Sequence, residues 1–184
     1  GFVALPGLVD SHTHLPFAGT RQDEFQLKLQ GVSYQEIASR GGGIRGTVGK
    51  TRAISLQELV GVCKKRLDQM LLSGTTTLEA KSGYGLELET ELKQLQALRQ
   101  LAGRHPVDII PTFMGAHEIP EDFRGKNREY LDHLLEDILP LVKEKKLADF
   151  VDIFCEDGYF SYDEAEHYLG QAAARGFRIK MHAD

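Results

Sequence analysis

The sequence has few of the residues that mark several classes of protein. It contains two cysteines and no tryptophan in 184 residues. Two cysteines in a chain of this length do not make a disulfide framework, so we expect a reducing compartment and a cytoplasmic location. The sequence shows no apolar run long enough to cross a membrane and no signal peptide, so we expect no membrane partner.

An excess of charge of one sign is also missing. Charged residues make up 27% of the chain, apolar residues 41%, and the formal net charge is -5. These values are ordinary for a globular protein, and a weak negative charge gives no reason to expect nucleic acid as a partner. We therefore expect one globular domain that is long enough to bury a core.

The sequence has no initial methionine, and each end lies close to an expected strand. The first residue is Gly1 and the last is Asp184. We expect the chain to be a piece of a longer protein.

Strand-like apolar runs alternate with segments of helical periodicity. We expect five strands, at residues 8–14, 75–81, 107–113, 150–154 and 177–181. We expect helices after capping signals at Ser55 and Ser161, one from Leu88 to about Gly103, and one from Asn127 towards Lys145 with a kink or break at Pro140. This alternation predicts a parallel sheet with helices outside it.

A long segment of residues 17–46 follows the first expected strand. Its apolar positions from Phe25 to Tyr34 and Ile37 indicate short helical pieces. The triplet Gly41–Gly43 lacks the Lys-Ser/Thr end of a phosphate-binding loop. We expect it to be a flexible or tightly turned connection rather than a substrate contact.

Polar side chains follow the carboxyl end of each expected strand. They are His12, His14, Lys81, Tyr84, His117, Glu156 and His182. A (β/α)8 barrel places its active site at this end of its strands, whereas a doubly wound sheet usually carries a glycine-rich loop after the first strand. We therefore expect the first five βα units of a (β/α)8 barrel over residues 1–184, with the remaining strands and a flanking small β domain outside them.

His12 and His14 are one residue apart at the end of the first expected strand. Residues i and i+2 of a strand point to the same face, so the two imidazoles would lie side by side. Neutral imidazole suits zinc, iron, nickel or copper better than magnesium or calcium. With His182 from another strand end, the pair predicts a metal site; the alternative is a solvated pair at the end of a strand.

Several segments carry a resemblance to a known family. Residues 6–14 (PGLVDSHTH) resemble the first-strand signature of the amidohydrolase superfamily. Five further segments are similar, more narrowly, to the imidazolonepropionase family: residues 17–21, 41–44, 79–85, 115–117 and 182–184. This resemblance implies a barrel of the amidohydrolase type and a metal-dependent hydrolase that opens 4-imidazolone-5-propanoate to N-formimidoyl-L-glutamate in histidine degradation.

The resemblance also implies a ligand set. His12, His14 and His182 would hold one Zn²⁺ or Fe per chain. The family's fourth ligand, an aspartate of a later strand, and its glutamate acid/base both lie beyond Asp184, so we name no catalytic residue and do not assign Asp184 as a ligand. Residues 150–154 contain no lysine to bridge two metals, which favours a mononuclear site.

Three residues are candidates for substrate binding by the same resemblance. Arg21 would hold a carboxylate with two parallel hydrogen bonds. Tyr84 would offer a hydroxyl and a ring to a flat heterocycle, and His117 would hydrogen-bond the substrate's carbonyl or ring nitrogen. The alternatives are a surface arginine, an aromatic residue that packs a loop, and a core histidine satisfied by backbone.

Other residues near the expected strand ends have supporting roles in this interpretation. We expect Lys81 to be a charge partner near the site, and Glu79 and Glu156 to orient ligands as hydrogen-bond acceptors. Cys155 is expected to be a buried structural thiol. His105, His133 and His167 are expected at the surface.

Two other functions remain open at this point. One is a different cyclic amidohydrolase, such as a base deaminase, that shares the metal site; Arg21 argues against it because purines and pyrimidines have no carboxylate. The other is a metal-binding fragment with no catalysis of its own. The partner expected is a small molecule with a carboxylate, and the resemblance makes a homodimer plausible.

Overall fold

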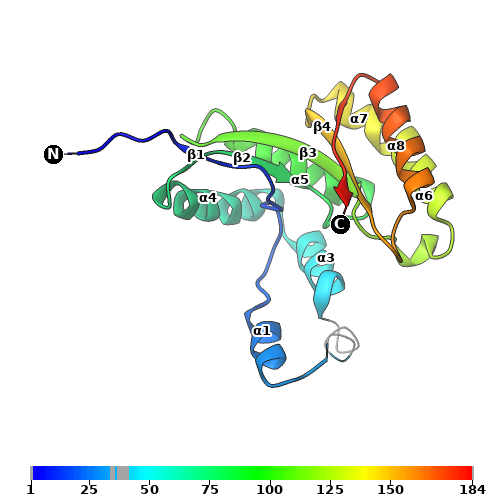
Figure 1. Ribbon diagram of the computed structural model, residues 1–184, viewed down its shortest axis with the longest axis horizontal. Coiled ribbons are helices and arrows are strands. Elements are labelled where there is room, and N and C mark those ends of the chain that lie inside the picture. The colour runs from blue at the N-terminus through cyan, green and yellow to red at the C-terminus, as the bar shows by residue number, and fades with distance from the viewer. Residues whose placement is uncertain (1, 34–35, 37–41, 184) are drawn as a thin grey trace.

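A computed structural model of the chain describes residues 2–33, 36 and 42–183, and it is built on one parallel sheet (Figure 1). The strands are β1 Leu8–Asp10, β2 Thr75–Lys81, β3 Asp108–Ala116, β4 Phe150–Cys155 and β5 Arg178–Ile179, and β6 His182–Ala183 also pairs with β4. Strands β1 to β5 lie side by side in chain order, and every pairing is parallel. A doubly wound sheet would reverse this order, so the expected wall of a (β/α)8 barrel is confirmed.

Helices join the strands and cover one face of the sheet. They include α4 Leu56–Leu72, α5 Leu88–Leu101, α6 Asn127–His133, α7 Leu139–Glu144 and α8 Tyr162–Ala174. The expected capping boxes are present: Ser55 and Glu58 begin α4, and Ser161 and Glu164 begin α8. Helix α4 packs on β2, α5 on β3 and α8 on β4, so the buried core lies between the helices and the sheet.

The first strand differs from its prediction. Strand β1 covers only Leu8–Asp10 instead of residues 8–14, and His12 and His14 follow its end. Leu8 and Val9 are 60% and 69% exposed, so the expected burial is wrong. The reason is position: β1 is an edge strand of the described sheet and pairs with β2 alone.

The strand expected at residues 177–181 is divided into two short strands. Strand β5 pairs with the beginning of β4, and β6 pairs with its end, at Phe154 and Cys155. Between them the N–H of Lys180 donates to the carbonyl of Val151. The polypeptide therefore stays beside β4 and delivers His182 to the carboxyl end of the sheet.

The break expected near Pro140 is confirmed and has a defined form. A π-helical turn, Leu134–Ile138, joins α6 to α7. Proline has no N–H to donate to the preceding turn, and its ring crowds the carbonyl four residues earlier, so the helix widens just before it.

The short helical piece expected around Phe25 is confirmed, and a second, unpredicted helix begins at the end of the same segment. Helix α1 spans Gln22–Leu29, and α3 spans Gly43–Ala53. Helix α3 was missed because Gly43, Gly46 and Gly49 lower its intrinsic helix propensity. Tyr34, Ile37, Gly41 and Asp184 lie outside the described residues.

Candidate metal centre

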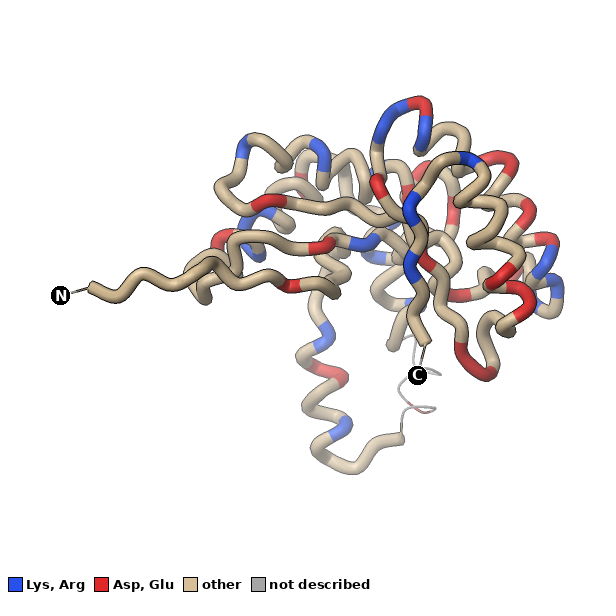
Figure 2. Tube along the Cα trace, turned by 45° about the horizontal axis from the view of Figure 1, so that its top comes forward, with Lys and Arg blue, Asp and Glu red and all other residues tan. Residues whose placement is uncertain are grey.

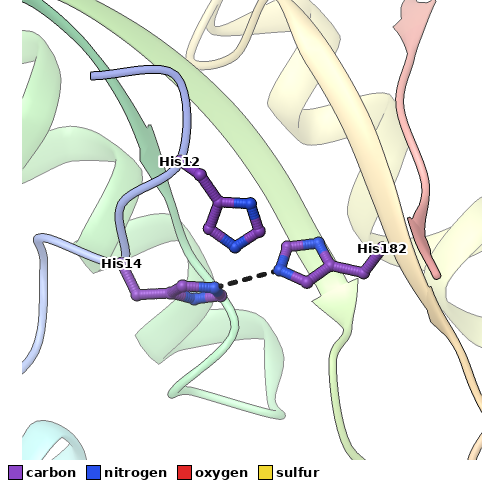
Figure 3. Close-up of side chains that lie close together, drawn as sticks. All are labelled: His12, His14 and His182. Carbon is purple, nitrogen blue, oxygen red and sulfur yellow. Dashed lines mark hydrogen bonds between the residues drawn. The ribbon is translucent and has the colours of Figure 1, made fainter. Parts of the chain in front are cut away.

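Three histidines converge at the carboxyl end of the sheet. His12 and His14 come from the segment after β1, and His182 comes from β6 (Figure 3). One ring nitrogen from each lies within 4.8 Å of the others. His14 Nε2 is 3.4 Å from His182 Nε2, and the rings of His12 and His182 are 4.1 Å apart. Side chains separated by about 170 residues in sequence thus form one cluster.

The two histidines of the first segment are held by the residue between them. The hydroxyl of Thr13 donates to the Glu79 carbonyl at 2.6 Å, and the Lys81 N–H donates to the Thr13 carbonyl at 2.9 Å. Thr13 is therefore fixed on β2, and the side chains on either side of it reach the cluster. The two imidazoles come together as predicted, through this anchor and not through a regular strand.

The cluster has the dimensions and the chemistry of a transition-metal site. Tetrahedral ligands 2.0–2.1 Å from a metal are separated by about 3.3 Å, which matches the 3.4 Å between the two Nε2 atoms. Burial, followed by the neighbouring His117, His182 and His12, lowers the pKa of His14 to about 3. Burial also lowers the pKa of His12. Neutral imidazoles offer the lone pairs that a metal requires.

A row of buried charges continues from His182 into the sheet. His182 Nδ1 is 3.0 Å from Asp152 Oδ2, and Asp152 pairs with Lys81 Nζ at 2.5 Å. Lys81 also pairs with Glu79 at 2.7 Å, and Glu79 pairs with Lys180 at 2.6 Å. Asp152, Lys81 and Glu79 are at most 4% exposed. The predicted role of Lys81 as a charge partner is confirmed.

Asp152 is the acceptor that the sequence interpretation missed. Its burial disfavours the charged form, but hydrogen bonds from His182 and Lys81 outweigh that effect and lower its pKa to about 2. The prediction that Glu79 or Glu156 would orient a ligand needs correction, because Glu79 reaches His182 only through Lys81 and Asp152. Glu156 accepts from the N–H of Asp157 instead. The sequence feature that could have identified Asp152 is that it is the single charged residue within the apolar run 150–154.

Aromatic rings border the cluster on one side. The ring of His117 stacks on His14 at 4.7 Å and 24°, and its Nδ1 lies 2.9 Å from the Gly83 carbonyl oxygen. The ring of Tyr84 lies 5.7 Å from His14 and 5.3 Å from His117. Both candidates for substrate contact therefore lie beside the three histidines.

Arg21 lies at the beginning of α1 and is partly exposed. Its Nε pairs with Glu24 Oε2 at 2.8 Å. Burial raises the pKa of Tyr84, and the positive charge of Arg21 opposes that rise.

Two expectations for residues outside the cluster need correction. The His105 side chain is 3% exposed, not at the surface, because it fills a gap between Asp68 (3.1 Å from its Nε2) and the N–H of Val107 (3.2 Å from its Nδ1). Cys155 is half-buried at the end of β4 and not fully buried. The predictions for His133 and His167 are closer, since their side chains are 34% and 32% exposed.

Parallel βα units with a histidine cluster at the carboxyl ends of their strands define an α/β barrel protein with a candidate metal centre at its mouth. Residues 3–184 match the amidohydrolase family, and the chain belongs to that family. Members of this family typically depend on a metal, which agrees with the three-histidine site.

Similar proteins with curated descriptions include imidazolonepropionases. That of Bacillus cytotoxicus is 54% identical over 184 residues, which are 100% of this chain and 43% of the relative. That of Bacillus cereus strain B4264 is 55% identical with the same coverage. The chain thus spans less than half the length of these relatives.

A solved structure shares the fold. The 5-methylcytosine deaminase of Klebsiella pneumoniae, liganded with phosphonocytosine, matches 97% of this chain and 40% of its own with a TM-score of 0.65. At 18% identity the likeness concerns the fold alone. No helix among the described residues is long and apolar enough to cross a membrane.

Proposed function

We propose that the complete protein containing this chain hydrolyses the ring C–N bond of 4-imidazolone-5-propanoate to give N-formimidoyl-L-glutamate. The observation that carries the proposal is 54% identity to an imidazolonepropionase over all 184 residues. The histidine cluster and the aromatic and cationic side chains around it are the parts that such a reaction requires.

His12, His14 and His182 would hold one Zn²⁺ or Fe, to which their neutral imidazoles and their spacing are suited. A bound metal of this kind supplies an activated water near neutral pH and polarises a carbonyl. Asp152 orients His182 so that Nε2 faces the other two histidines. We assign no acid/base among residues 1–184 and expect it, with a fourth ligand, elsewhere in the complete protein.

The substrate would lie against Tyr84 and His117. The Gly83 carbonyl can only accept a hydrogen bond, so His117 Nδ1 carries the proton that faces it. Burial lowers the pKa of His117, which keeps the ring neutral and leaves its Nε2 free to accept. A ring N–H of the substrate would donate to that nitrogen, and Arg21 would leave Glu24 to hold the propionate.

The test compares the complete protein with a His12→Ala/His14→Ala variant and a His133→Ala control. Elemental analysis measures the metal, and separate assays measure ring opening and ammonia release. We expect about one Zn or Fe per chain and ring opening in the parent and in the control, with both lost in the double variant. Ammonia release from a cyclic base would favour a deaminase, and metal without turnover would favour a binding module.

Two finer inferences accompany this proposal. Cys63 and Cys155 are both free thiols, which supports a reducing, cytoplasmic location. A homodimer stays a prediction. Acidic and basic residues are interspersed along the described chain (Figure 2), which supports a small-molecule partner over a polyanion.

A further inference from the structure

A buried carboxylate lies behind the loop that carries Tyr84. We call Ser82–Leu86 the Tyr84 loop. Glu91 of α5 is 0% exposed and accepts hydrogen bonds from three backbone N–H groups of this loop, those of Gly83 at 3.1 Å, Gly85 at 2.8 Å and Leu86 at 3.0 Å. The Ser82 hydroxyl also hydrogen-bonds it. Four of the five loop residues therefore depend on one side chain.

Gln94, one turn further along α5, also binds the Tyr84 loop and connects it to the segment after β1. Its side-chain oxygen accepts from the N–H of Tyr84 at 3.3 Å, and its amide nitrogen donates to the carbonyl of Pro16 at 2.5 Å. Gln94 is 0% exposed. Pro16 is two residues beyond His14, so the same helix face holds the Tyr84 loop and the segment of the metal ligands at a fixed separation.

The loop adopts a backbone that local sequence does not favour. Gly83 has φ +108°, and Leu86, which carries a side chain, has φ +56°. A non-glycine residue at positive φ persists only where its surroundings hold it. An added Cβ at Gly85 would lie 2.9 Å from the Glu91 carboxylate, which shows how closely the loop is packed on that group.

Glu91 and Gln94 make contacts that a helix does not need for its own stability. Of the two acidic residues in the first turn of α5, Glu89 is at the surface and Glu91 is not. Burying a carboxylate is unfavourable unless it is fully hydrogen-bonded, and burial does raise the pKa of Glu91. The contacts of this carboxylate are directed at the loop, whose one side chain beside the histidine cluster is Tyr84.

We propose that Glu91 and Gln94 are positioning residues that fix the ring and hydroxyl of Tyr84 relative to His14 and His117, and so set the affinity for the heterocyclic substrate. The inference rests on the proposed function, in which Tyr84 contacts the substrate. Neither residue touches the histidines or the substrate itself. Their effect passes through the loop backbone.

The experiment is a double-mutant cycle in the complete protein with Glu91→Gln, Tyr84→Ala and the double variant, and with Glu89→Gln as the matched control on the same helix. Glutamine keeps the shape of Glu91 but turns an N–H₂ either towards the N–H of Gly83 or towards those of Gly85 and Leu86, which share one carboxylate oxygen. We expect Glu91→Gln to raise KM for 4-imidazolone-5-propanoate by about tenfold, with kcat changed less than threefold and metal content unchanged. In the Tyr84→Ala background, where both ring and hydroxyl are gone, the same substitution should raise KM by less than threefold.

Hydrogen exchange gives a readout that does not depend on turnover. The amide of Gly83, or those of Gly85 and Leu86, should exchange faster in Glu91→Gln than in the parent and the Glu89→Gln control. Unchanged hydrogen exchange in Glu91→Gln would overturn the positioning role and leave the proposed function intact. An equal increase of KM with and without Tyr84, measured while ring opening persists, would do the same. No ring opening by the parent overturns the proposed function, and the substrate role of the loop with it. Should Glu91→Gln fail to fold, Gln94→Met takes its place in the cycle, with the same outcomes deciding.

Discussion

His182 Nδ1 lies 3.0 Å from Asp152 Oδ2. A carboxylate whose pKa is lowered to about 2 is ionised at neutral pH and can only accept, so Nδ1 carries the hydrogen. The other nitrogen, Nε2, faces His14 and offers its lone pair when the ring is neutral. One carboxylate in the middle of β4 thereby fixes both the orientation and the tautomer of a predicted metal ligand.

Asp152→Asn should destabilise the chain in a pH-dependent way. The pKa of the carboxyl is lowered from 3.8 to about 2, so its ionisation stabilises the fold fully above the unfolded value and the effect is lost as the pH falls towards 2. We expect a loss of about 2 kcal/mol in the free energy of unfolding at pH 7 that shrinks between pH 4 and pH 2. Urea unfolding measures it, with the exposed Asp108→Asn as control. A loss in the free energy of unfolding that does not change with pH would contradict the lowered pKa of Asp152.

Arg21→Ala should weaken substrate binding in the complete protein. The guanidinium can hold a carboxylate through two parallel hydrogen bonds, and an alanine cannot. We expect KM to rise by about tenfold with little change in kcat, a partial effect in Arg21→Lys, and none in Arg45→Ala, which removes an exposed pair with Glu121. Steady-state kinetics measures this, and an unchanged KM would remove Arg21 from the site.

Gly83→Ala and Gly103→Ala should differ although both glycines have positive φ, +108° and +80°. An added Cβ at Gly103 meets nothing within 4 Å, whereas at Gly83 it lies 2.8 Å from the Met114 carbonyl oxygen and 2.9 Å from His117 Cβ. We expect Gly103→Ala to cost roughly 1–2 kcal/mol and Gly83→Ala roughly 2–4 kcal/mol. Chemical denaturation of both variants provides the comparison, and equal losses would show that backbone strain alone decides.

The two thiols should react very differently. Cys63 is fully buried, and burial raises its pKa to about 12, so almost no thiolate exists at pH 8. Cys155 is half-buried at the end of β4. A thiol-specific reagent should modify one cysteine in the native chain and two in denaturant, and none in native Cys155→Ser. Rapid labelling of Cys63 in the native state would disprove its burial.

Local signals in the sequence predicted the elements that local chemistry decides. The predictions were correct for both capping boxes, for the strand Thr75–Lys81 and for the helix Leu88–Leu101. Side-chain periodicity and capping depend only on residues a few positions apart. The order of strand and helix was enough to predict the barrel wall. The exposure of Val9 and the burial of His105 depend on which elements lie next to them, and a single sequence does not contain that information.

The candidate site was predictable to the same extent. His12, His14 and His182 were found because each follows a strand and carries metal-binding chemistry, and the structure brings them together. Asp152 was missed because its partner is 30 residues away and its own neighbours are apolar. Glu91 was missed because its position in an acidic first turn is that of an ordinary surface residue.

The row of Glu79, Asp152, Lys81 and Lys180 holds two negative and two positive charges, and three of the four are buried. Such a row sums to zero, so apolar residues of similar volume at all four positions would fold at least as well, while the loss of one partner would be severe. Because the row ends at His182 through Asp152, the loss of any one of its charges would disturb the histidine cluster as well as the sheet.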